Sequence, residues 1–181
     1  MSKQQVIIFD GPDGCGKTNI AEALSDNIGV PVFKNKLEWD FFDDNNSQEY
    51  FKTAIRYQHP YILSYLEQTG SSVIFDRAHP SEFVYSRVFD RETCMSSLEL
   101  CDEMSAKMSA KIIIPYRTSY DNVKDEHGVT TEQLIRIEYE YRQFAKLTRC
   151  DIYFLNVDDE NLDRELQEIM RFLGSKNETG L

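Results

Sequence analysis

Short apolar runs alternate along the chain with longer segments in which apolar residues recur every three or four positions. The runs have the length of buried strands, because a strand covered on both faces reads as a continuous hydrophobic segment. The longer segments have the period of helices that bury one face. The runs lie at residues 5–10, 30–34, 71–77, 110–116 and 150–158, and the helical segments at 17–29, 47–70, 79–108, 130–149 and 159–174.

This fivefold alternation predicts an α/β fold in which a five-stranded parallel sheet is flanked by helices on both faces. The 181 residues suit one domain with a sizeable core. Pro60 predicts a bend within the segment 47–70, and the segment 79–108 is long enough for two helices. Thr130 or Thr131 is a suitable N-cap for the helix that is expected to end at Arg149.

The loop between the first strand and the first helix carries the strongest chemical signal. It reads GPDGCGKT and fits the phosphate-loop pattern G-x-x-x-x-G-K-[ST] at every fixed position. Glycines let consecutive backbone N–H groups turn toward a phosphate, and the following helix adds its positive end. The chain is therefore predicted to have a three-layer P-loop NTPase fold and to bind ATP through Gly11, Asp13, Gly14, Cys15, Gly16, Lys17 and Thr18. Lys17 is expected to reach the β- and γ-phosphates, and the Thr18 hydroxyl to hold Mg²⁺.

A second candidate pair, Asp76 and Arg77, ends the third predicted strand. Ligands of open α/β sheets bind at the carboxyl ends of the strands. Asp76 is expected to hold Mg²⁺ together with Thr18, through a water, and Arg77 to clamp a second phosphate. Within the preceding helix, Arg56 and His59 lie three positions apart and are expected to share one face.

The charge and cysteine content of the chain limit the classes of partner that it is expected to bind and the location in which it is expected to work. With 31 acidic and 20 basic residues, the net charge is -11, which argues against nucleic acid as the main partner because Lys and Arg carry that binding. A basic pocket for a small anion is still compatible with this charge. The four cysteines form no CxxC pair, and the start of the chain has no signal peptide, so we expect reduced thiols and a cytoplasmic location. No apolar run approaches the ~20 residues of a membrane span.

Together, these segments resemble the thymidylate kinase family of nucleoside monophosphate kinases. The family's motifs are matched here by FDGPDGCGKT, by AIRYQH at 54–59 and by DRAHPSEFVYS from Asp76 onward. The resemblance implies that Asp13 faces the acceptor sugar and that Arg77 holds the acceptor's 5′-phosphate. It further implies that Arg56 lies near the acceptor base, that Ser81 and Tyr85 line the acceptor pocket, and that Asp10 is the acidic residue before the loop.

The chain departs from the family pattern around the acceptor base. Ala78 stands where a Tyr is usual, and the arginine-proline segment after the second strand is replaced by FKNKLEWDFF, in which Lys34 or Lys36 can supply the missing charge. The expected stacking aromatic is replaced by Lys52. Candidates for the stacking role are Phe51, Trp39, Phe41 and Phe42, and Trp39 is counted among the substrate-binding residues.

A lid is expected at about residues 116–129, between the fourth strand and the long helix. The phosphate loop lacks a basic residue at the two places held by Gly14 and Cys15. The lid should therefore supply the further positive charge that phosphoryl transfer needs. Arg117 and Lys124 are the catalytic candidates, with Arg136 behind them.

These features predict a deoxynucleoside monophosphate kinase that uses ATP and Mg²⁺, with a thymidylate-like or modified pyrimidine acceptor. A deoxynucleoside kinase with Glu38 as general base is the first alternative, and a kinase for a hydroxymethylated pyrimidine the second. A nucleotide-binding switch without turnover is the third, although the chain lacks the guanine-reading N-K-x-D. Members of the family are often homodimers, so a homodimer stays open.

Overall fold

The structure is a computed structural model that describes residues 4–34, 52–121, 123 and 128–174. Its five strands form one sheet in which every pairing is parallel, as the alternation predicts. The strand order is β2-β3-β1-β4-β5. The strands are β1 Val6–Phe9, β2 Val32–Lys34, β3 Val73–Asp76, β4 Lys111–Tyr116 and β5 Asp151–Asn156.

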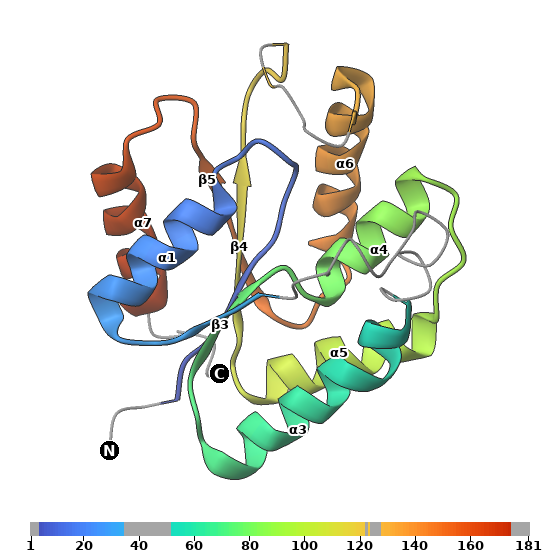
Figure 1. Cartoon of the computed structure of the whole chain (residues 1–181), viewed down its shortest axis with the longest axis vertical. Helices are drawn as coiled ribbons and strands as arrows, with labels where there is room; N and C mark the ends of the chain where they lie inside the picture. Colours follow the sequence, from blue (N-terminus) through green and yellow to red (C-terminus); the bar gives the residue numbers. More distant parts are fainter. Residues whose placement is uncertain (1–3, 35–51, 122, 124–127, 175–181) are drawn as a thin grey trace, which may run out of the picture.

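Helices cover the two faces of the sheet unequally (Figure 1). On one side, α1 packs against α7, and on the other, α3, α4, α5 and α6 pack against one another. The three-layer α/β prediction is confirmed. The helices are α1 Lys17–Ile28, α3 His59–Thr69, α4 His79–Val88, α5 Met95–Lys107, α6 Thr131–Phe144 and α7 Leu162–Gly174, and the π-helix η1 Ala54–Gln58 precedes α3.

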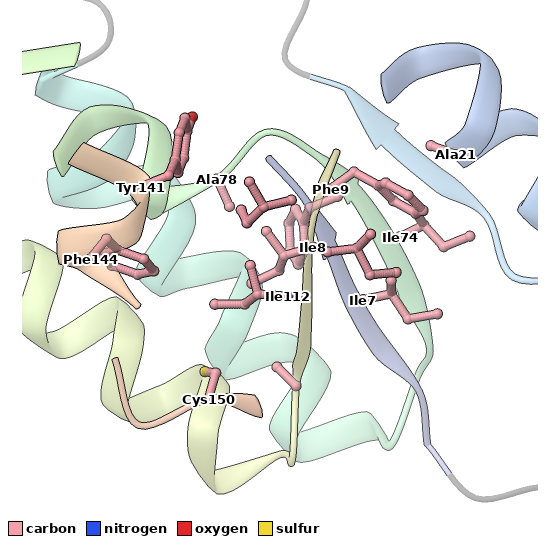
Figure 2. Packing of buried hydrophobic residues seen from close by; sticks show 14 of the residues in the cluster. Ile7, Ile8, Phe9, Ala21, Ile74, Ala78, Ile112, Tyr141, Phe144 and Cys150 are labelled. Atoms are coloured by element: carbon pink, nitrogen blue, oxygen red, sulfur yellow. The ribbon is translucent and has the colours of Figure 1, made fainter. Parts of the chain in front are cut away.

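The core lies along the two faces of the central strands (Figure 2). Ile7, Ile8 and Ile112 are at most 1% exposed, as expected for apolar strands covered on both sides. From α6, Tyr141 and Phe144 belong to the same buried cluster as these strand residues and help to close the second face (Figure 2). The short apolar runs of the sequence therefore become the buried centre of the fold.

Three local features differ from the sequence expectations or refine them. The bend before Pro60 is a π-helical turn, η1, rather than a simple proline kink. The segment 79–108 forms two helices, as expected. Thr130 caps α6 in a reciprocal capping box with Gln133, but α6 ends at Phe144 instead of reaching Arg149.

The strand order brings the candidate residues to one edge of the sheet. Strand β1 lies between β3 and β4. Its last residue, Phe9, is in register with Asp76, the last residue of β3. In turn, Asp76 is in register with Lys34, the last residue of β2. Three strands therefore end beside the phosphate loop. In the part of the chain that the structure describes, no helix combines the length and apolar character needed to cross a bilayer.

Candidate active site

The loop from β1 to α1 is shaped by glycines whose backbone conformations other residues rarely adopt. Gly11 has a φ of 140°, and a Cβ placed there would lie 2.8 Å from the Pro115 carbonyl oxygen of β4. At Gly14, with a φ of 74°, a Cβ would clash with Val123. The glycines thus let the loop pass close to β4 on one side and to the segment after β4 on the other.

Lys17 begins α1 and folds back over the loop. Its side chain is only 7% exposed, and its ammonium donates to the Pro12 carbonyl oxygen at 2.5 Å. The Asp13 carboxylate lies 3.9 Å away. Burial, together with the nearby positive charge of Arg77, lowers the pKa of Lys17 to about 8, although Asp13 opposes the shift. Lys17 is thus a buried cation that an added anion would stabilise.

Thr18 and Asp76 meet across the sheet edge, as the sequence predicts for a metal site. The Thr18 hydroxyl donates to the Asp76 carboxylate at 2.7 Å. The ammonium of Lys34 lies 3.0 Å from the same carboxylate oxygen and 3.0 Å from the Thr18 oxygen. A cationic group therefore already sits on these two hard oxygen donors, and the donor set fits Mg²⁺.

Asp10 is the centre of a buried hydrogen-bond network. It is fully buried, and Oδ1 accepts from the Gly11 backbone N–H at 3.1 Å, the Tyr141 hydroxyl at 2.6 Å and the Ser81 hydroxyl. Oδ2 accepts from the backbone N–H groups of Ala78 at 3.1 Å and Ser81 at 3.0 Å. Asp10, the residue after β1, thus caps the N-terminal end of α4 and links this helix to the phosphate loop and to α6.

Arg77 is held over the phosphate loop by contacts on several sides. Its backbone has a φ of 70°, a conformation that is costly for a residue with a side chain. Nη1 donates to the Gly11 carbonyl at 3.3 Å, the Ser81 hydroxyl at 3.2 Å and the Tyr85 hydroxyl at 3.3 Å, while Nη2 pairs with Asp13. The side chain is still 31% exposed, so an anion from the solvent can reach the guanidinium.

The structure brings the predicted acceptor-side residues Asp13, Ser81 and Tyr85 together around Arg77. The Tyr85 hydroxyl donates to the second oxygen of Asp13 at 2.5 Å, and the guanidinium lies 5.1 Å from the Tyr85 ring centroid. Ser81 and Tyr85 project from the same side of α4 because they are four residues apart. Asp13 and Tyr85 together orient the guanidinium, and the Asp13 carboxylate balances its charge.

Arg117 also reaches the phosphate loop. Its Nε donates to the Gly14 carbonyl at 3.1 Å, and its Nη2 pairs with Glu160 at 2.7 Å. The start of the expected lid therefore contacts the loop. In contrast, Arg136 donates to the backbone of Arg87 on α4, away from the loop.

Arg56 and His59 do not share a face, so this part of the sequence interpretation is wrong. Arg56 is exposed and lies over the Tyr57 ring, at 5.4 Å from its centroid. His59 is only 3% exposed and stacks on Phe75. The reason is the π-helical turn, which adds a residue to the turn and changes the angular spacing between neighbours.

Several sequence candidates lie outside the residues that the structure describes: Trp39, Lys124, Glu38, Lys36, Phe41, Phe42 and Phe51. Sequence reasoning missed Tyr141, which lies 131 positions from Asp10 and carries no motif. It also missed Glu160, the partner of Arg117. Neither residue gives a local signal, because each acts only through a contact that the fold creates.

A family model covers most of the chain. The model described as an AAA domain, AAA_28, matches residues 6–164. The chain belongs to this family. No curated protein matches the sequence.

Solved structures that include a thymidylate kinase and a deoxyadenosine kinase share the fold of this chain at low identity. Thymidylate kinase from Ehrlichia chaffeensis is 18% identical with a TM-score of 0.64, covering 95% of this chain and 100% of that one. YorR from Bacillus subtilis, in complex with phosphorylated GDP, is 19% identical with a TM-score of 0.64, covering 93% and 95%. Deoxyadenosine kinase from M. mycoides is 20% identical with a TM-score of 0.54, covering 95% and 100%. The fold expected from the resemblance to thymidylate kinases is confirmed.

The Asp10 network predicts that an isosteric amide will not replace the carboxylate. In Asp10→Asn, the amide NH₂ must face hydrogen-bond donors at one of the two oxygen positions. We expect the free energy of unfolding, measured by urea titration, to fall by about 2–3 kcal/mol. The exposed α1 residue Asp26 is the matched control, and Asp26→Asn should change the value by less than about 0.5 kcal/mol. Equal changes in the two variants would contradict the network's role.

Proposed function

We propose that this protein is an ATP- and Mg²⁺-dependent kinase that phosphorylates a pyrimidine deoxynucleoside monophosphate of the thymidylate type. The observation that carries the proposal is the position of Arg77. Its guanidinium contacts the carbonyl oxygen of Gly11 and the carboxylate of Asp13, both in the phosphate loop. A phosphate bound to Arg77 would therefore lie next to a triphosphate bound in the loop.

On the donor side, the loop amides and Lys17 would hold the triphosphate of ATP. Thr18 and Asp76 would hold Mg²⁺, which when bound neutralises charge on the β- and γ-phosphates. Arg117 lies against the Gly14 carbonyl and is suited to compensate charge from the side of the lid. Lys124 stays a second lid candidate from the sequence.

On the acceptor side, Arg77 would exchange part of its pairing with Asp13 for the acceptor phosphate. Asp13 and Tyr85 would then be available to hydrogen-bond the acceptor sugar, with Ser81 supporting the guanidinium. Arg56 and Trp39 are proposed on the side of the base, from the family resemblance. A phosphate is already a nucleophile near neutral pH, so these residues act by positioning and charge compensation rather than as a general base.

The structural relatives support this class of reaction. Among them are a thymidylate kinase and a deoxyadenosine kinase, the latter with the products dCMP and dCDP bound. The deoxyadenosine kinase also supports the main alternative, in which this protein is a deoxynucleoside kinase. Such an enzyme phosphorylates a 5′-hydroxyl rather than a phosphate. That reaction requires a general base, for which Glu38 is the candidate.

A panel of acceptors tests the proposal. Wild-type protein with ATP and Mg²⁺ is offered each natural deoxynucleoside monophosphate, thymidine, and hydroxymethyl-dUMP, and ADP release is measured. The proposal expects turnover with dTMP or another pyrimidine monophosphate. Turnover with thymidine alone would establish the nucleoside kinase instead. Binding of ATP without its conversion to ADP in the presence of any acceptor would indicate a regulatory module.

Replacing either Lys17 or Arg77 with a neutral residue should reduce the stabilisation of the transition state. We expect Lys17→Ala and Arg77→Ala each to lower kcat/KM roughly thirtyfold or more. This corresponds to a loss of about 2 kcal/mol of transition-state stabilisation, because each change removes a cation from the reacting phosphates. Arg87 on the same helix as Tyr85 is the matched control, since it is half exposed and pairs with Glu140 of α6. Arg87→Ala should keep kcat/KM within twofold of wild type. If Arg77→Ala did the same, the role assigned to Arg77 would be excluded.

The lowered pKa of Lys17 predicts proton uptake on ATP binding. With a pKa of about 8, Lys17 is about half protonated at pH 8. A triphosphate raises this pKa, so binding at pH 8 should take up about half a proton, and binding at pH 6.5 almost none. The measurement is the dependence of the calorimetric binding enthalpy on the buffer's ionisation enthalpy. Lys17→Arg, which is charged at both pH values, should abolish the uptake, and equal uptake in wild type and variant would refute the assignment.

A further inference from the structure

Lys34 lies on the oxygens that the proposed mechanism assigns to the metal. It is the last residue of β2 and is in register with Asp76 of β3. Its ammonium is 3.0 Å from Asp76 Oδ2 and 3.0 Å from Thr18 Oγ1, and these two oxygens are themselves hydrogen-bonded at 2.7 Å. The Asp76 side chain is only 3% exposed, whereas that of Lys34 is 46% exposed. A movable cation thus covers a nearly buried anion.

This arrangement makes the ammonium and a divalent cation mutually exclusive. Mg²⁺ binds its oxygen ligands at about 2.0–2.1 Å, so a metal on the Thr18 hydroxyl would lie closer to Oγ1 than the ammonium does now, and a water that joins the metal to Asp76 would need the position on Oδ2 that the ammonium holds. Two cations that share one carboxylate oxygen and one hydroxyl would repel each other strongly at such a separation. For Thr18 and Asp76 to hold a metal, Lys34 must therefore leave.

We propose that Lys34 is an internal competitor of the metal, released toward the acceptor phosphate when Mg²⁺–ATP binds. The proposal rests on the proposed function. The backbone of Lys34 is fixed by the pairing of β2 with β3, so only the side chain can move. Arg77 directly follows Asp76 in the chain, and the proposal places the released ammonium beside the guanidinium that would hold the acceptor phosphate. Lys34 would then exchange a carboxylate for a phosphate as its counter-ion.

The chain contains a matched pair that separates this role from an ordinary ion pair. Lys111 and Asp151 are also register partners on neighbouring parallel strands, and their ion-pair distance is also 3.0 Å. They lie at the first residues of β4 and β5, which is the opposite edge of the sheet from the phosphate loop. A Lys→Met change at either position removes the same charge from a register pair with the same ion-pair distance.

The first measurement is metal affinity, which does not depend on turnover. Mn²⁺ is titrated by electron paramagnetic resonance into the full chain with a non-hydrolysable ATP analogue present. We expect Lys34→Met and Lys34→Gln to bind Mn²⁺ about five- to tenfold more tightly than wild type, because the competing cation is gone. Lys34→Arg and Lys111→Met should stay within twofold of wild type. An unchanged or weaker affinity in both neutral Lys34 variants would overturn the proposal.

The second measurement is acceptor affinity, for which the expected change has the opposite sign. With the ATP analogue and Mg²⁺ present, dTMP should bind several-fold more weakly to Lys34→Met than to wild type, while Lys111→Met should leave this affinity unchanged. Equal dTMP affinity in wild type and Lys34→Met would overturn the release step. A failure of the proposed function shows separately, in the turnover of the wild-type protein with the acceptor panel.

Discussion

The arrangement of the site depends on one buried carboxylate, Asp10. A charge in the core is tolerated only where hydrogen bonds compensate for lost hydration, and here five donors do so. The donors come from the phosphate loop, from the start of α4 and from Tyr141 of α6. Asp10 therefore fixes the separation between the loop that would hold the donor and the helix that follows Arg77. Few other groups could do this, because a carboxylate accepts on both oxygens and donates to none.

Around this fixed point, the charges of the candidate site are arranged in exchangeable pairs. Arg77 pairs with Asp13, and Lys34 lies between Asp76 and Thr18. Lys17 instead contacts a backbone carbonyl and is buried, so its charge is the least compensated of the three. The site as proposed would receive two phosphates and a metal, and it must hold its cations in place without them. Partial pairing with movable or shared carboxylates does so at modest cost, since each pair keeps one partly exposed member.

Much of this arrangement was predictable because it is encoded locally. The apolar runs give the strands, and Gly11 to Thr18 give the phosphate loop within one continuous segment. Asp76 and Arg77 could be assigned to the same edge because parallel strands end together. The π-helical turn could not be predicted, since Ala54 to Gln58 form an ordinary helical pattern, and it separates Arg56 from the buried His59. The end of α6 at Phe144, rather than at Arg149, likewise could not be predicted, because the sequence carries no helix-stop signal at Phe144.

The sequence by itself thus determined the fold class, the phosphate loop and the identity of the residues at the strand ends. Each of these follows from neighbours along the chain, through periodicity or through the backbone freedom of glycine. Only the tertiary structure decided which charges meet. Tyr141 reaches Asp10 across 131 positions, Arg77 meets Asp13 across 64, and Lys34 covers Asp76 because β2 is paired with β3. Such contacts have no local signature, because side chains distant in sequence are brought together by the packing of the sheet and helices.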